Sequence, residues 1–368
     1  MHLTERRKTE HIVITVSEDV GSRRSSLLEC VHFIHRALPQ LSLDEVRLET
    51  RLLGREVSAP IIVAGMTGGS ELGGRVNREI AIAAEALKIG MGVGSQRAAL
   101  ENPELRHTFS VVREEAPSIP IIANIGASQL VEADDYATLA AELVDMVEAD
   151  AVAVHLNPLQ EAVQPEGEPA YAGVVEAIRE FVKACSKPVI VKETGSGISR
   201  EDAELLMKTG IWGIDVGGLG GTSFAAVEAI RAKMNGDFIA ERVANTFRSW
   251  GIPTAASILE VRSVARNVTL IATGGIRSGL DAARALRLGA DLAGVARPII
   301  KAALEGGSER VKKVLESYIK ELRITLFLTG SRDVGELRKR PAIILGDLKE
   351  WVVARGLEDF ARNCGLFF

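Results

Sequence analysis

Eight short apolar runs that alternate with helical stretches constrain the fold of this chain more than any other feature of its sequence. Each run is about five residues long and apolar almost throughout, as expected for a strand buried on both faces of a parallel sheet. We predict strands at 61–65, 89–93, 120–124, 151–156, 188–192, 212–216, 269–273 and 292–296.

Helical stretches separate these strands, and such an alternation forms either a closed barrel or an open, doubly wound sheet. Ser199 and Ser278 each precede acidic residues, a pattern typical of a helix start. Eight units in roughly 270 residues favour the barrel. The predicted fold class is therefore α/β, a (β/α)8 TIM barrel. Its clearest helical stretches are 75–88, 134–148, 199–209 and 278–288.

Residues 1–59 precede the first strand, and we expect them to form an N-terminal extension of helix and hairpin that packs on the barrel and contributes to its site. No linker divides the chain, so residues 1–368 are predicted to be a single domain. The stretch 218–250 is long for one loop and is expected to be an elaborated excursion at the active site.

Charge and cysteine content limit the classes of partner. The net charge of -5 argues against a general nucleic-acid or anionic-membrane surface, so an anionic ligand must be held by a local cluster of cations. Cys30, Cys185 and Cys364 are scattered, which suits a reducing cytoplasm without a disulfide framework. No run is apolar enough to predict a signal peptide or a membrane span.

The expected strand ends are unusually polar. In such a barrel the chemistry lies at the carboxyl ends of the strands. The loops after strands seven and eight are the usual phosphate site, and there the run 274–277 offers glycines for close backbone approach and a cation in Arg277; the alternative is an ordinary turn with a surface arginine. Polar or glycine residues follow all eight strands, at 66–69, 94–97, 124, 155–157, 192–195, 217–223, 274–279 and 296–297.

Lys192 ends an apolar strand, so its ammonium should project into the barrel mouth, where a half-buried cation needs an anion. It could form a Schiff base, as in aldolases. It could stabilise the negative charge of a reduced flavin. It could also simply extend its ammonium to solvent.

Together these motifs resemble those of the type 2 isopentenyl diphosphate isomerases, FMN-dependent barrels of archaea and some bacteria. The resemblance runs over nearly the whole chain, and its most specific parts are M-T-G-G at 66–69, G-V-G-S-Q-R at 92–97 and H-L-N-P-L-Q-E at 155–161. Further matches are R-R-K at 6–8, A-N-I-G-A at 123–127, K-E at 192–193, 217–223, 250–254 and 274–279.

The resemblance implies a role for particular residues. FMN would be bound by Met66, Thr67, Ser95, Asn124, Lys192, Thr222, Gly275, Arg277 and Ala296. The substrate would be bound by Arg7, Lys8, Ser95, Arg97, His155, Asn157 and Gln160, with Gln160 facing the prenyl end. Glu161 would hold Mg²⁺, and Gln160, Lys192 and His155 would be the catalytic residues.

The implied reaction moves a double bond by adding a proton to one carbon and removing one from another, a step of isoprenoid biosynthesis. It would require reduced FMN and therefore NADPH or another reductant, although no hydride reaches the product. The same resemblance implies a cytoplasmic homotetramer or homo-octamer.

Several alternatives remain open at this stage. Arg7 and Lys8 could belong to a solvated basic tail, Glu161 to a solvated loop, and His155 could be a general base, a phosphate donor or a core residue. A rival FMN barrel would oxidise a 2-hydroxy acid, but the run 217–221 lacks the histidine that this chemistry needs. Other rivals are a reductase of nitrogen heterocycles and a non-catalytic sensor of phosphate ligands.

Overall fold

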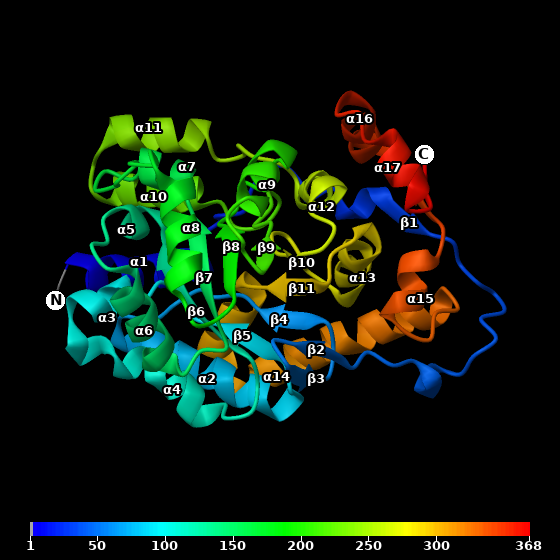
Figure 1. The fold of residues 1–368 in the computed structure, drawn as a ribbon, viewed down its shortest axis with the longest axis horizontal. Helices are drawn as coiled ribbons and strands as arrows, with labels where there is room; N and C mark the ends of the chain where they lie inside the picture. Colours follow the sequence, from blue (N-terminus) through cyan, green and yellow to red (C-terminus); the bar gives the residue numbers. More distant parts are fainter. Residues whose placement is uncertain (1–2) are drawn as a thin grey trace.

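The computed structural model describes residues 3–368, and in it all eight predicted strands are present and close into one parallel barrel (Figure 1). The order around the barrel is β10-β11-β4-β5-β6-β7-β8-β9, so the fold prediction is confirmed. The barrel strands are β4 (Ile61–Val63), β5 (Gly90–Gly92), β6 (Ile121–Gly126), β7 (Ala151–Leu156), β8 (Val189–Glu193), β9 (Gly213–Asp215), β10 (Thr269–Ala272) and β11 (Leu292–Val295).

The strands are apolar on both faces because each face meets its own core. One layer points inward and includes Ile62, Ile122 and Ile190, while the residues beside them in sequence pack outward against the helices. Side chains alternate with a period of two along a strand. A residue two positions after an inward side chain therefore also points into the barrel. The functional side chains at the strand ends point inward for this reason.

Helices surround the barrel and follow each strand. The four predicted helical stretches are confirmed, as α2, α6, α9 and α13. The covering helices are α2 (Glu71–Leu87), α4 (His107–Glu115), α6 (Tyr136–Val147), α8 (Val174–Ala184), α9 (Arg200–Met207), α12 (Thr254–Val264), α13 (Gly279–Leu288) and α14 (Arg297–Leu328), the last broken at Gly306 and Gly307. Shorter helices are α3 (Arg97–Glu101), η3 (Pro103–Leu105), α5 (Ala127–Val131) and α7 (Pro158–Val163).

The long stretch after β9 is a helical hairpin made of α10 (Phe224–Met234) and α11 (Phe238–Thr246). In Figure 1 this pair lies with α7 at the same end of the molecule as the N-terminal helix α1 (Leu3–Ser17). Contacts of α10 with both α7 and α1 make the excursion one wall of the barrel mouth.

The N-terminal extension contacts both ends of the barrel. Its hairpin, β2 (Thr50–Leu52) and β3 (Arg55–Val57), inserts Leu52 and Val57 into the inner core and closes the amino-terminal end. The helix α1 reaches the opposite end, where the functional groups gather.

The extension also pairs with the C-terminal segment, which the sequence did not predict. The strand β1 joins β12 and β13 in a three-stranded sheet on the side of the barrel opposite α1 (Figure 1). The elements there are η1 (Leu28–Cys30), β1 (Val31–Phe33), η2 (Leu43–Glu45), α15 (Val334–Lys339), β12 (Ala342–Ile344), α16 (Gly346–Ala354), α17 (Glu358–Asn363) and β13 (Leu366–Phe367). Within residues 3–368, no helix has the length and apolar character of a membrane span.

Candidate active site

Three ionisable side chains form one row inside the barrel mouth. His155 on β7 pairs in register with Lys192 on β8, and Lys192 pairs with Asp215 on β9. His155 and Lys192 stand two residues after the inward residues Ala153 and Ile190, and Asp215 lines the same inner cavity as Lys192, so all three point into the barrel. The sequence predicted the first two, whereas Asp215 lay unnoticed within a run taken as apolar.

Asn124 connects this row to the neighbouring strands. Its amide nitrogen donates to the carbonyl oxygen of Val93 at 3.1 Å, so its side-chain oxygen faces His155 Nδ1 at 3.0 Å. Gln96, which is fully buried, accepts from the backbone N–H of Asn124 at 2.9 Å and donates to Leu143. The expected FMN ligand Asn124 is thus held rigidly, and it directs the histidine.

His155 is a neutral ring in this structure. Burial, helped by the nearby charges of Lys192 and Lys8, lowers the pKa of His155 to about 3. Since Nδ1 donates to the side-chain oxygen of Asn124, Nε2 is the acceptor nitrogen of the neutral ring. An anion in the mouth would reverse this preference, because a negative charge stabilises the imidazolium form.

Lys192 is free to serve a ligand. Its ammonium donates to the carbonyl oxygen of Glu193 at 3.3 Å, and within residues 3–368 it has no carboxylate within 4.0 Å. Glu193 points outward, and its carboxylate accepts from the backbone N–H groups of Gly195 at 2.6 Å and Gly197 at 3.1 Å, and also from that of Ser196. Burial nevertheless raises the pKa of Glu193 to about 7.

Backbone groups form an anion cradle between the loops after β9 and β10. Within the described chain, the N–H groups of Gly275 and Ile276 have no acceptor. Gly275 has φ +73°, and a Cβ there would lie 2.8 Å from the carbonyl oxygen of Gly220. Arg277 donates to that same oxygen at 2.7 Å, which fixes its guanidinium beside the cradle. Unpaired N–H groups and a cation suit a phosphate.

Thr222 and Ala296 flank this cradle. Thr222 follows the glycine run and forms an isolated bridge with Gly21 of the extension. Ala296 is the residue before α14, and its carbonyl oxygen accepts from the backbone N–H groups of Ile299 at 2.9 Å and Ile300 at 3.3 Å. Arg297, by contrast, donates to the carbonyl oxygens of Thr15 and Glu18, both at 2.8 Å. Arg297 therefore binds the end of α1 rather than the cradle.

The N-terminal helix brings Lys8 to the mouth. Lys8 Nζ donates to the carbonyl oxygen of Ser95 at 2.6 Å and lies 5.6 Å from the centre of the Phe109 ring. Burial and the charge of Arg7 lower the pKa of Lys8 to about 7, although Glu101 partly opposes them. The hydrogen bond from Arg97 lowers the pKa of Glu168, and the charge of Arg7 adds to this effect, so Arg7 also lies near the mouth.

Glu228 is a residue of this region that the sequence analysis missed. It is fully buried on α10, where it contacts His11 Nε2 at 2.9 Å and Arg231 at 2.7 Å. The amide nitrogen of Gln160 lies 3.4 Å from the same carboxylate. No local motif marks Glu228, because its significance comes from α1, α7 and α10 meeting in space.

The start of α7 carries the remaining predicted groups. Asn157 donates to Gln160 at 3.2 Å and to Glu161 at 2.8 Å, and it accepts from the hydroxyl of Tyr171 at 2.9 Å. Glu161 also accepts from the backbone N–H of Glu168 at 2.8 Å. Across residues 3–368 no three His, Cys, Asp or Glu side chains are grouped as a metal site, so Glu161 does not belong to such a cluster.

Arg97 is held by carboxylates of the chain itself. Its guanidinium forms a bidentate pair with Glu168, at 2.8 and 3.1 Å, and a third contact with Glu101 at 2.6 Å. Thr67 is buried, and its carbonyl accepts from the N–H of Gly94 at 2.7 Å, which joins the ends of β4 and β5. Met66, beside it, is partly buried. All the predicted site residues therefore lie at or around one barrel mouth.

Comparison with known proteins defines the class first. The family model for FMN-dependent dehydrogenases matches residues 159–343. The structure resembles a lactate oxidase of Pediococcus acidilactici (TM-score 0.66, 18% identity, 93% of each chain) and a mandelate oxidase (TM-score 0.62, 20% identity, 92% of this chain and 95% of that one). At this identity the likeness shows a shared fold: the chain is an FMN-type (β/α)8 barrel.

The sequence relatives define the family. The isopentenyl-diphosphate delta-isomerase of Methanopyrus kandleri is 48% identical over 95% of both chains. That of Ignicoccus hospitalis is also 48% identical, over 98% of this chain and 99% of its own. The chain belongs to the isopentenyl-diphosphate delta-isomerase family.

Proposed function

We propose that this chain interconverts isopentenyl diphosphate and dimethylallyl diphosphate in isoprenoid biosynthesis, with reduced FMN as its cofactor. The observation that carries the proposal is the convergence of Lys8 from the extension with Ser95, His155 and Lys192 from the barrel. These side chains lie beside a separate backbone cradle, as a phosphate-bearing cofactor and a second, anionic ligand require.

The FMN phosphate would be held by the N–H groups at Gly275 and by Thr222, Arg277 and Ala296. The ring system would lie over the barrel mouth against Met66, Thr67, Ser95, Asn124 and Lys192. When bound and reduced, FMN would supply a negative charge and a ring nitrogen that can exchange a proton. Lys192 would neutralise part of that charge and hold the ring in place.

The substrate diphosphate would be held by Arg7, Lys8, Ser95, Arg97, His155 and Asn157. Arg97 has to exchange Glu168 for the ligand, and its planar fork suits either partner. Lys8 has a pKa of about 7 in the free protein, so an incoming anion would restore its full charge. His155 would take up a proton for the same reason and then donate to the diphosphate.

The reaction adds a proton to the terminal methylene carbon and removes one from the neighbouring allylic carbon, with no net redox change. Between these two steps the substrate would carry the positive charge of a tertiary cation. A negatively charged reduced flavin close to it would stabilise that charge. Gln160, held by Asn157, would lie beside the prenyl group and orient a proton, because its amide does not titrate.

Turnover tests this proposal against its oxidoreductase rival. With FMN, Mg²⁺, a reductant such as NADPH and isopentenyl diphosphate in D2O, we expect dimethylallyl diphosphate that contains deuterium. The reductant should be consumed only in reducing the flavin. Consumption of one reductant per substrate, or no product, would contradict the proposal.

We propose that Glu161 binds Mg²⁺ together with the diphosphate. Mg²⁺ usually needs only one or two protein carboxylates and keeps several water ligands. Glu161→Ala should raise the Mg²⁺ concentration needed for half-maximal activity about tenfold and leave the flavin spectrum unchanged. Glu142→Ala, at an exposed position on α6, is the control. An unchanged Mg²⁺ dependence in the first variant would remove Glu161 from the metal site.

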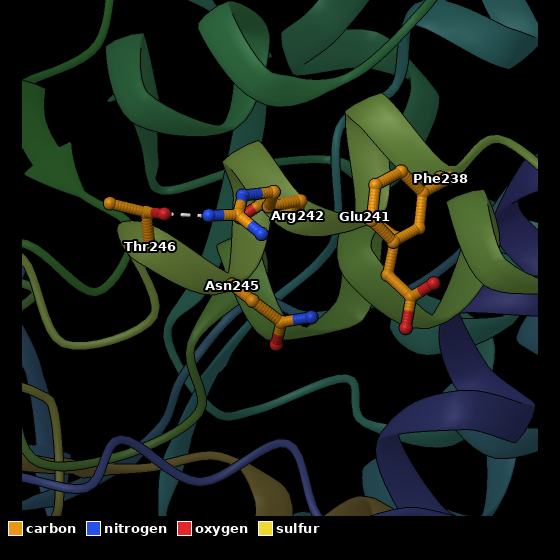
Figure 2. Close-up of a pocket in the computed structure, with 5 residues that line it drawn as sticks. All are labelled: Phe238, Glu241, Arg242, Asn245 and Thr246. Atoms are coloured by element: carbon orange, nitrogen blue, oxygen red, sulfur yellow. Dashed lines mark hydrogen bonds between the residues drawn. The ribbon is translucent and has the colours of Figure 1, made fainter.

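We also propose that the chain forms a homotetramer or homo-octamer in the cytoplasm. The helix α11 supports self-association, because Phe238 and Ile239 are 68% and 75% exposed and Trp250 beyond it is 63% exposed. Figure 2 shows a hollow along the same helix, and its lining residues Glu241 and Arg242 have opposite charges and no ion-pair partner within residues 3–368. An antiparallel copy of α11 could pair these charges.

Ile239→Asp should reduce the particle mass measured by light scattering, whereas Leu38→Asp, equally exposed but elsewhere, should not. An unchanged mass in the first variant would show that copies associate through another face. The cytoplasmic location agrees with three free cysteines and is tested by cell fractionation.

A further inference from the structure

Asp215 is a buried acid for which the proposed reaction has no role. It is 5% exposed and lines a small cavity inside the barrel mouth, together with Lys192, Asn124 and Thr273. The other described lining residues are glycines and apolar side chains, so among residues 3–368 only Lys192 and Asp215 bring charges to this cavity wall. A buried carboxylate is costly unless it is compensated.

Two donors fix the position of the carboxylate. The Thr273 hydroxyl donates to Asp215 Oδ1 at 2.6 Å, and the backbone N–H of Gly217 donates to the same oxygen at 3.3 Å. Thr273 follows β10 and Gly217 follows β9, so the loops on both sides of the anion cradle are joined to Asp215. A carboxylate placed this way cannot move away when a ligand arrives.

Lys192 is the cation nearest to this carboxylate in the barrel row, yet the two do not form a closed ion pair. They are partners in register on neighbouring strands. Burial raises the pKa of Asp215, and the charge of Lys192 partly opposes that rise. Within residues 3–368 no oxygen of Asp215 comes within 4.0 Å of the ammonium. The ammonium of Lys192 can therefore bind a ligand while it still interacts electrostatically with the carboxylate of Asp215.

We propose that Asp215 is a positioning residue that shares Lys192 with the bound flavin and so sets the net charge at the Lys192 end of the FMN site. The inference rests on the FMN binding proposed above. A single cation would then face two anions, the carboxylate and the reduced flavin. Removing the carboxylate should make a negative flavin more favourable, since charges several ångströms apart within a protein change equilibria on the order of tenfold.

The ionisation of Asp215 depends on its neighbours. Burial raises its pKa, and Lys192, Thr273 and Gly217 lower it. The other titratable groups that face the row are His155 on β7 and Lys8 from α1, whereas Glu193 points away from it. The effect should therefore be measured in alkaline buffer, where the carboxylate is ionised.

The test compares wild type, Asp215→Asn and Asp44→Asn, all saturated with FMN. Asp44 lies exposed on η2, so the control removes the same charge far from the barrel mouth. Two readouts need no substrate: the midpoint potential of the flavin, and the affinity for sulfite, which adds to oxidised flavin as an anion. We expect a more positive potential and about tenfold tighter sulfite binding in Asp215→Asn only.

Asp215→Ser, which is smaller and also neutral, replaces the asparagine variant if the latter does not fold. Unchanged potential and sulfite affinity in a neutral variant that retains FMN would overturn the inference and leave the isomerase proposal intact. Loss of FMN from both neutral variants but not from Asp215→Glu would also overturn it, by giving Asp215 a purely structural role. A wild-type chain that takes up no FMN would overturn both proposals.

Discussion

The two anion-binding regions of the barrel mouth are built in opposite ways. On the β9–β10 side, the donors are backbone N–H groups held by glycines, and they have no partner within the described chain. On the side of α1 and α7, the groups are long charged side chains that already have partners, Arg97 with Glu168 and Lys8 with Ser95. The first region is preorganised, whereas the second must exchange contacts when a ligand binds.

This difference has a physical reason. A cofactor that stays bound gains most from donors that need no rearrangement, because ordering costs reduce affinity. A substrate that has to leave in every cycle is better served by side chains whose internal partners compete for them. The comparison predicts that substitutions on the two sides separate cofactor binding from substrate binding.

The largest expected effect is on the substrate side. Arg7→Ala/Lys8→Ala should lose on the order of a hundredfold or more in kcat/KM, since each residue would make a charge-assisted hydrogen bond of roughly 1.5–3 kcal/mol and a tenfold change is about 1.4 kcal/mol. FMN affinity should barely change, whereas thermal stability should fall modestly, because the Lys8 side chain contacts Ser95 and Phe109. Arg6→Ala is the control, because that side chain is 67% exposed and forms an ion pair with Glu10, one turn further along α1.

Full activity of the double variant would make the basic segment irrelevant to the substrate. Loss of FMN together with activity would erase the distinction between the two regions.

The second effect is on the cofactor side. Gly275→Ala should weaken FMN binding at least about tenfold, because the new Cβ would lie 2.8 Å from Gly220 O and 3.0 Å from Ser26 Cβ. Flavin titration measures this. Gly236→Ala has the same φ of +73° but meets nothing within 4 Å, so it controls for backbone strain alone. Equal FMN affinities in the two variants would contradict the proposal that the backbone at Gly275 binds the FMN phosphate.

The third effect is on pH dependence. Because the pKa of Lys8 is lowered to about 7, the free protein loses this charge as the pH rises above 7. If the charged form binds the diphosphate, kcat/KM should fall up to tenfold per pH unit on the alkaline side. In Lys8→Arg the charge persists, so this decline should disappear. An identical alkaline profile in both proteins would assign the titration to another group.

The smallest effect is a gain. Glu168→Gln should improve the KM for the diphosphate about threefold, because Arg97 is released from a partly exposed pair of the kind worth roughly 0.2–1 kcal/mol. Glu176→Gln, on the exposed face of α8, should have no effect. A higher KM in Glu168→Gln would mean that Glu168 assists substrate binding rather than competing with the diphosphate for Arg97.

The barrel itself could be predicted because its signal is local. Each strand is a short apolar run, and each strand end carries its functional residue in the adjacent positions, so Lys192, Asn124 and His155 could be placed at the mouth from periodicity alone. The phosphate cradle is similar, since glycines at 274–275 reveal close backbone approach without reference to the rest of the chain. Asp215 was missed because one acid within a short apolar run hardly changes the pattern.

Long-range pairing could not be predicted in the same way. Lys8 contacts Ser95, 87 residues away, Arg97 pairs with Glu168, 71 residues away, and Arg297 binds carbonyl groups about 280 residues away. Nothing near a charged residue in sequence identifies such a distant partner. The same holds for the sheet that joins β1 to β12 and for Glu228, which gains its importance only where three helices meet.

The sequence by itself therefore determined the barrel, the strand ends that carry polar groups and the family resemblance, because all three depend on residues that are close along the chain. Only the tertiary structure decided which charges are free and which are paired. That distinction depends on distances of a few ångströms between groups far apart in sequence, and it separates the open cradle from the internally paired substrate side.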